Sequence, residues 1–259
     1  MSHIKVLKVG GSIITEKEKN EPSPDLEQME RIAREIKDSL PSLSGLVLIH
    51  GAGSYGHPIV KRTGIHQGIK TDKDKVHFAE TQRLQNELNS IFTKILTDND
   101  IPAFPVQPSA SAIMHGSLRS MNHEVVGSLV GEDVVPVLYG VPAYDRTKGC
   151  SILSGDEILP YLAEKIGAKE VLHGTNVDGI YTSDPHKDPS SELIEEITSM
   201  EEVDRYLGGS KDTDVTGGMR NKVKHLLESG ISGKIFDASK HNNVKKALRG
   251  DKVGTHVRS

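Results

Sequence analysis

Residues 50–58, HGAGSYGHP, combine residue types and a spacing that suggest a phosphate-binding loop. They follow the apolar run 46–49, which we expect to be a buried strand. Their three glycines fit the spacing G-x-G-x-x-G, and a glycine loop after a strand offers its backbone N–H groups to phosphates of any kind. His57 follows the last glycine and adds an imidazole that a dinucleotide-binding loop does not require.

A dinucleotide fingerprint is one interpretation of this loop, but its context is wrong. That fingerprint follows the first strand of a βαβ unit and needs an acidic residue at the end of the next strand, about 20 residues further on. Asp72 and Asp74 lie at that distance, but no apolar strand precedes them. We therefore favour a phosphate-binding loop of another kind.

Four further segments place glycine beside charged residues. Lys8 shortly precedes Gly10 and Gly11, so an ammonium and bare backbone amides would reach the same anion. A second pair, Gly217-Gly218, is expected to open a helix that carries Lys222 on its first turn, and such a helix start would clamp a phosphate. Each segment alone is also typical of a turn or a helix cap. Together they indicate a site for several phosphates: KVGGS at 8–12, SGD at 154–156, GTNVDGIY at 174–181 and DVTGGMRNK at 214–222.

Composition excludes several other functions. The sequence has no Walker A loop, no protein-kinase signature and no G-x-S-x-G elbow. A formal net charge of -4 without a basic stripe gives no support to a nucleic-acid partner. No apolar run reaches the ~18 residues of a membrane span. With Cys150 as the single cysteine and no signal-peptide pattern at the start, we expect a cytoplasmic protein.

The strands and helices that must position these residues alternate along the 259-residue chain. Pro136 predicts that its strand is interrupted or lies at a sheet edge, and Pro160 is expected in or near the first turn of its helix. Residues 17–24 and 61–74 are expected to be loops near the site. We expect strands at 4–9, 46–49, 102–106, 134–138, 170–173 and 232–236, and helices at 26–39, 75–98, 124–132, 156–166, 219–229 and 243–248.

Strands separated by helices predict βαβ units and an α/β fold. We expect a three-layer αβα sandwich with a central, mainly parallel open sheet. Because ligands of such sheets bind at the carboxyl ends of the strands, the glycine segments should meet at that edge.

The order of the motifs resembles the isopentenyl phosphate kinases of the amino acid kinase superfamily. The matching segments are KVGGSIIT, HGAGSYGH, SGD, TNVDGIY with a following Asp-Pro pair, and DVTGGM, and they span nearly the whole chain. The resemblance implies one amino acid kinase domain over 1–259, with an acceptor lobe at about 1–150 and a nucleotide lobe at about 151–259. It implies a homodimer that uses ATP and Mg²⁺ to phosphorylate isopentenyl phosphate in the archaeal-type mevalonate pathway.

The resemblance also implies roles for single residues. Asp156 would position Lys8 and Lys222, and Lys17 would be a further phosphate-binding lysine; with His57 these form the catalytic set. No residue is implied as a metal ligand. The acceptor phosphate would contact Ala52, Gly53, His57, Ser154 and Gly155. ATP would contact Lys8, Gly10, Gly11, Ser12, Gly53, Thr175, Asp178, Tyr181, Gly217, Gly218 and Lys222.

This chemistry needs positioning more than a strong base, because the acceptor is already a phosphate anion. Its apolar tail is expected along residues 82–92, with Ile113 and Ile152, and smaller residues at Leu84 or Phe92 would admit longer prenyl phosphates. The competing interpretation of these side chains is ordinary core. Competing functions are a fosfomycin kinase, a UMP kinase and a non-catalytic phosphate or nucleotide sensor.

Overall fold

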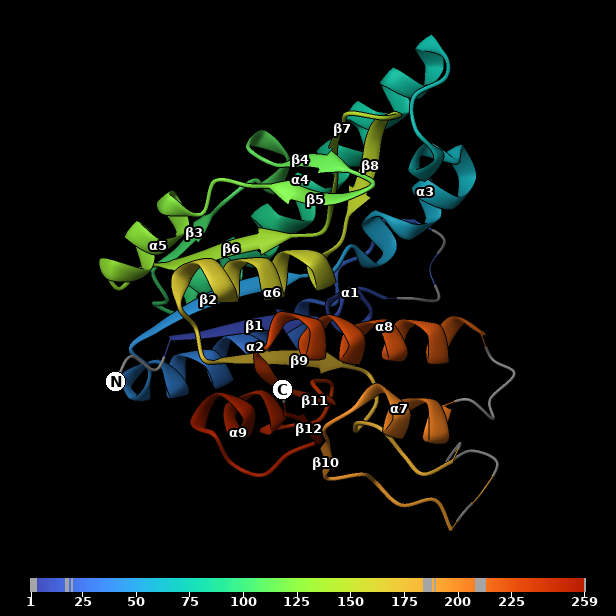
Figure 1. Cartoon of the computed structure of the whole chain (residues 1–259). Helices are drawn as coiled ribbons and strands as arrows, with labels where there is room; N and C mark the ends of the chain where they lie inside the picture. Colours follow the sequence, from blue (N-terminus) through green and yellow to red (C-terminus); the bar gives the residue numbers. More distant parts are fainter. Residues whose placement is uncertain are drawn as a thin grey trace.

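The computed structural model describes residues 4–16, 19, 21–183, 188, 190–207 and 213–258. Its central sheet is built from Ile4–Val9 (β1), Gly45–His50 (β2), Ala103–Pro105 (β3), Val135–Tyr139 (β6), Glu170–Thr175 (β9), Glu196–Ile197 (β10), Ser232–Asp237 (β11) and Thr255–Val257 (β12). These eight strands follow the order β10-β12-β11-β9-β1-β2-β6-β3 (Figure 1). All neighbouring pairs are parallel except β11 and β12. The carboxyl ends of β1, β2 and β9 therefore lie side by side.

Helices cover both faces of this sheet (Figure 1). Side chains alternate along a strand, so Leu7 and Val9 point to one face while Val6 and Lys8 point to the other. The first face packs against Leu26–Ser39 (α2), Asp72–Asp98 (α4) and Asn243–Arg249 (α9). The second packs against Glu124–Gly131 (α5), Gly155–Ile166 (α6) and Thr213–Ser229 (α8), with Met200–Leu207 (α7) beside α8. This arrangement confirms the predicted α/β sandwich.

A second, four-stranded sheet was not predicted. Its strands, Ile113–His115 (β4), Ser117–Ser120 (β5), Val141–Asp145 (β7) and Gly149–Leu153 (β8), follow the order β5-β4-β7-β8. The buried carboxylate of Asp145 ties its turns together, accepting hydrogen bonds from Ser151 Oγ at 2.5 Å, Thr147 N at 2.8 Å and Gly116 N at 3.0 Å. Burial alone would raise the pKa of Asp145, but these donors hold it well below its ordinary value.

The predicted elements of the main sheet are present, and two proline predictions need correction. Pro136 does not lie at an edge, because β6 pairs with both β2 and β3. Its missing N–H is tolerated since the pairing of β2 with β6 begins only at Val137. Pro160 lies inside α6, beyond the first turn that begins at Gly155.

The two predicted loops differ in outcome. Residues 61–63 end the short helix His57–Thr63 (α3), and Ile65–Gln67 form a single 3₁₀ turn, so 61–74 is only partly irregular. In 17–24, residues 17, 18 and 20 lie outside the described part of the chain. No helix in the described part is both long and apolar enough to cross a membrane.

Candidate active site

Two lysines converge on one carboxylate near the carboxyl end of β1. Lys8 Nζ lies 2.5 Å from Asp156 Oδ1, and Lys222 Nζ lies 3.5 Å from Asp156 Oδ2. Lys8 comes from β1, Asp156 from the first turn of α6 and Lys222 from α8. Residues far apart in sequence thus form one cluster, as expected from the motifs.

Burial sets the electrostatics of this cluster. It lowers the pKa of Lys8, an effect that the neighbouring carboxylate opposes. Burial would also raise the pKa of Asp156, but Lys8, His173 and Lys222 together hold it well below its ordinary value. Asp156 therefore stays ionised and can hold two ammonium groups whose charge would otherwise repel.

The start of α6 explains how Asp156 reaches the lysines. Ser154 is the N-cap: its Oγ accepts a hydrogen bond from Glu157 N at 3.2 Å, and Glu157 Oε2 accepts one from Ser154 N at 3.3 Å. Asp156 is thus free from the capping role and turns toward the sheet. A Cβ added to Gly155 would lie only 3.1 Å from Lys8 Cε, so glycine allows this close packing.

The two predicted glycine loops touch each other through their backbones. A Cβ added to Gly11 would lie 2.1 Å from Gly53 N, and one added to Gly51 would lie 2.4 Å from Gly11 N. Thr15 joins the loops, since its Oγ1 donates to Gly11 O at 2.8 Å and accepts from Ser54 N at 3.0 Å. No side chain fits between the predicted ATP loop and the predicted acceptor loop.

Hydrogen bonds fix each loop to the neighbouring strand end. Gly10 N donates to Gly174 O at 2.8 Å, and Gly51 N donates to Val9 O at 2.9 Å. Ser12 lies in the single turn Gly11–Ile14 (α1) that follows β1. The loop after β1 is therefore anchored to β9 on one side and to β2 on the other.

The acceptor residues predicted on the second loop are brought together. Ala52 caps the 3₁₀ turn Gly53–Tyr55, and the exposed His57 is the first residue of α3. Gly56 lies between them and packs closely, because a Cβ there would lie 2.6 Å from Ala52 Cβ. The imidazole and the glycine amides therefore belong to one short, compact turn next to Gly11.

The predicted nucleoside residues form a separate, more exposed group. Asp178 accepts from Tyr181 OH at 3.0 Å through Oδ2, and its Oδ1 lies 2.5 Å from Lys240 Nζ. Thr175 Oγ1, at the end of β9, donates to Val177 O at 3.0 Å and shapes the turn that carries Asp178. Lys240 was not predicted, since nothing in its local sequence marks it.

The predicted helix opening at the second glycine pair is wrong. α8 begins at Thr213, so Gly217 and Gly218 lie inside the helix and Lys222 lies beyond its first turn. Each glycine inside a helix costs about 1 kcal/mol relative to alanine, so the pair costs about 2 kcal/mol, and the apolar packing of the remainder of α8 offsets this cost. Lys222 still reaches the cluster, donating also to Gly218 O at 3.4 Å. The predicted Lys17 lies outside the described residues.

The face of α4 that faces the acceptor loop is more polar than expected for an apolar tail. Phe92 is fully buried in the core between α4 and the sheet, and Leu84 packs against that core. Gln85 is buried as well, and its amide lies against Gly56 without a hydrogen-bond partner among the described residues. The core interpretation therefore holds for Phe92.

The structure adds His173 to the cluster. This buried histidine on β9 has Nδ1 3.4 Å from Asp156 Oδ1. The available signal for His173 was an ionisable side chain within the apolar strand sequence EVLHGT. Lys8 is a similar ionisable residue within the strand sequence IKVLKV, and the two residues are register partners in the sheet.

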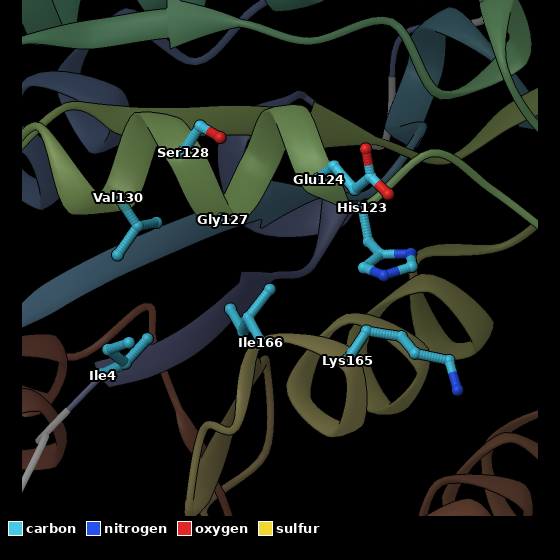
Figure 2. A pocket seen from close by; sticks show the side chains of 8 residues that line it. All are labelled: Ile4, His123, Glu124, Gly127, Ser128, Val130, Lys165 and Ile166. Carbon is cyan, nitrogen blue, oxygen red and sulfur yellow. The ribbon is translucent and has the colours of Figure 1, made fainter.

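Two further cavities lie away from the cluster. One of about 410 Å³ lies between α5 and α6; Figure 2 shows His123, the N-cap of α5, and Glu124 on one side and Lys165 and Ile166 of α6 on the other. The other, of about 510 Å³, lies beside α4 and includes Tyr139. Neither is lined by a predicted phosphate-binding or nucleotide-binding residue, although the second includes Asn86, Asn89 and Ser90 of the segment expected to hold the acceptor's tail.

Comparison with known proteins agrees with this geometry. Residues 3–236 match the model of the amino acid kinase family. The isopentenyl phosphate kinase of Methanothermobacter thermautotrophicus is 38% identical over 97% of this chain and 98% of its own length, and that of Methanocaldococcus jannaschii is 36% identical over 97% of each. A solved isopentenyl phosphate kinase, 34% identical, superposes with a TM-score of 0.84 over 98% of this chain and 100% of its own. The matched length, the shared fold and the joined glycine loops together show that the chain belongs to the amino acid kinase family and, within it, to the isopentenyl phosphate kinases.

Proposed function

We propose that this protein transfers the γ-phosphoryl group of ATP to isopentenyl phosphate and forms isopentenyl diphosphate. The observation that carries the proposal is the convergence of Lys8 and Lys222 on Asp156, beside two glycine loops in backbone contact. Such a site suits two phosphate groups held end to end. The acceptor is inferred from the relatives, which are isopentenyl phosphate kinases.

In this reaction an oxygen of the acceptor phosphate attacks the γ-phosphorus of ATP, and the bond to the β–γ bridging oxygen breaks to release ADP. The acceptor oxygen is already anionic, so no general base is required. Lys8 and Lys222 neutralise the charge on the transferred group, and Asp156 keeps both ammonium groups in place. The two loops bring the reacting atoms together before reaction.

The remaining residues are assigned by their place around this centre. Lys17 would be a further phosphate-binding lysine. His57, with Ala52 and Gly53, binds the acceptor phosphate, which Ser154 and Gly155 border. The nucleoside is held by Thr175, Asp178 and Tyr181. The ATP phosphates are held by Gly10, Gly11, Ser12, Gly53, Gly217 and Gly218.

Magnesium belongs to the proposal as the partner of ATP. Among the described residues, no three His, Cys, Asp or Glu side chains lie together as a cation site. Mg²⁺ commonly keeps several waters and binds through one or two carboxylates together with substrate phosphates. The ion would supply charge neutralisation on the β- and γ-phosphates.

The assignment to an acceptor lobe over about 1–150, a nucleotide lobe over about 151–259, a homodimer and a cytoplasmic location is also part of this proposal. Sedimentation velocity measures the assembly directly. A mass of one chain across the working concentration range would remove the homodimer and leave the catalytic proposal in place.

A coupled ADP-release assay tests the reaction. Isopentenyl phosphate, dimethylallyl phosphate, UMP and fosfomycin are offered in parallel with MgATP, and ³¹P NMR identifies the diphosphate product. We expect the highest kcat/KM with isopentenyl phosphate. Preference for UMP or fosfomycin would assign another kinase activity, and ATP binding without turnover of any acceptor would assign a sensor.

His57→Ala is expected to abolish activity with isopentenyl phosphate, whereas His57→Gln keeps part of it through its amide donor. Steady-state kinetics with varied acceptor measure the loss. The exposed His66, on the 3₁₀ turn that follows α3, provides the matched control, and His66→Ala should leave kcat/KM unchanged. Full activity of His57→Ala would remove His57 from the site.

A further inference from the structure

His173 is a buried histidine beside the lysine cluster for which the reaction described above has no use. It lies on β9, where the register places it next to Lys8 of β1 and Ile235 of β11. Its side chain points to the face covered by α6 and α8, because its neighbour Val171 belongs to the core on that face. The imidazole therefore lies between the sheet and the first turn of α6, next to Asp156.

The contacts of His173 leave its ring incompletely paired. Nδ1 is 3.4 Å from Asp156 Oδ1, slightly longer than a hydrogen bond, and neither ring nitrogen makes a hydrogen bond to the described residues. Buried polar groups are normally paired, so an unpaired imidazole at this position calls for a functional explanation. Asp156 is the acceptor that a small movement of either side chain would engage.

The surrounding charges favour a neutral imidazole. Burial lowers the pKa of His173, Asp156 opposes this effect, and Lys8 and Lys222 lower the pKa further. A neutral imidazole carries one N–H, and the carboxylate at Nδ1 selects the tautomer with the proton on that nitrogen. His173 is then an uncharged donor beside Asp156, the carboxylate that also contacts the two ammonium groups.

We propose that His173 is a positioning residue that donates its Nδ1–H to Asp156 Oδ1 and fixes the orientation of the carboxylate. With Oδ1 held by His173 and Lys8, Oδ2 stays directed at Lys222. When phosphates draw both lysines away from Asp156, the neutral donor keeps the carboxylate from rotating. This inference rests on the proposed phosphoryl transfer.

Three substitutions separate positioning from packing. His173→Asn places an amide N–H near the position of Nδ1, His173→Gln places it near Nε2, and His173→Leu removes the donor while keeping bulk. We expect kcat to fall about 10- to 100-fold in His173→Leu and His173→Gln, with KM for ATP within about 3-fold. His173→Asn should stay within about 3-fold of the wild type. Thermal unfolding is recorded for each variant.

Either of two kinetic results would overturn the proposal: wild-type kcat in a folded His173→Leu, or equal losses in His173→Asn and His173→Leu. If a variant fails to fold, an NMR measurement on the wild-type protein still tests the proposal. ¹⁵N NMR with labelled histidine, assigned through His173→Asn, should show a neutral ring with the proton on Nδ1 at pH 7. A proton on Nε2 overturns the inference. The proton on Nδ1 in an enzyme that does not turn over isopentenyl phosphate would reject the proposed acceptor and keep the positioning contact.

Discussion

Two lysine–aspartate pairs of the same length lie at opposite ends of the proposed ATP site. Lys8–Asp156 and Lys240–Asp178 both have an N–O distance of 2.5 Å. The side chains of the first pair are 11% and 25% exposed, whereas those of the second are 55% and 33% exposed. The pKa of Lys8 is lowered, mainly by burial, while that of Lys240 is raised, mainly by its hydrogen bond to Asp178.

The difference teaches that burial, and not distance, decides what an ion pair contributes. Removing one partner of a buried pair leaves an uncompensated charge and costs about 3–5 kcal/mol. An exposed pair at the same distance contributes about 0–1 kcal/mol, because water screens it and side-chain entropy opposes it. We therefore expect the first pair to control catalysis and the second to adjust nucleotide affinity.

The largest effect is expected at the buried pair. Asp156→Asn removes the charge that holds two ammonium groups, so kcat should fall about 10²- to 10³-fold, as for the loss of one transition-state contact. Steady-state kinetics and urea unfolding measure activity and stability together. The control is Asp204→Asn, which breaks the exposed pair with Arg220 at 2.7 Å and should leave kcat unchanged.

The comparison would fail if Asp156→Asn kept wild-type kcat, because burial would then not distinguish the two pairs. A loss of stability without a loss of kcat would assign Asp156 to folding alone.

The next effect concerns an ionisable group that is buried without a charged partner in the described part of the chain. His50 lies on the other face of the sheet, with Nδ1 3.0 Å from Gly51 O and Nε2 3.1 Å from Asn89 Nδ2. Burial lowers its pKa from 6.5 to about 4. The unfolded chain therefore binds a proton first, and stability should fall as the pH drops from about 6.5 to about 4, by up to about 3 kcal/mol.

Urea unfolding at pH 7 and pH 4.5 measures this contribution of His50. His50→Gln should lose less stability between the two pH values than the wild type does. His66→Gln replaces an exposed histidine and should keep the wild-type dependence of stability on pH. Equal slopes in all three proteins would show that His50 titrates normally.

The smallest effect is expected at the exposed pair. Lys240→Met should raise KM for ATP by no more than about 5-fold and leave kcat near the wild-type value. Because exposed charges are screened, the difference should shrink further at 1 M salt. A fall in kcat as large as that of Asp156→Asn would erase the distinction between the pairs.

Sequence patterns predicted six of the eight strands of the central sheet, because these strands are apolar and their helices amphipathic, as β1 and α2 illustrate, and missed the short strands β10 and β12. They failed for the second sheet, whose short strands carry exposed residues such as Tyr144 and depend on a distant contact with Asp145. They also placed the start of α8 too late, because Gly217 and Gly218 resemble a turn and only tertiary packing overrides that preference.

The grouping of charged residues at the candidate site was predicted from local motifs. Lys8 and Asp156 lie in such motifs, so their convergence was predicted, and the structure places the two side chains in contact. Lys240 and His173 lack such motifs. Lys240 lies more than 60 residues from Asp178 in the sequence. His173 reaches the cluster because β9 pairs with β1. Their partners are a property of the folded chain.

The backbone contact between Gly11 and Gly51–Gly53 has a consequence for changing the acceptor. If ATP and acceptor lie along these loops, the gap between donor phosphorus and acceptor oxygen is set by the radii of main-chain atoms, which mutation cannot alter except by adding a side chain. Substrate range can then change at the far end of the acceptor pocket without changing the reacting distance. A single methyl group at Gly11, which would meet Gly53 N at 2.1 Å, would lengthen that distance for every acceptor alike.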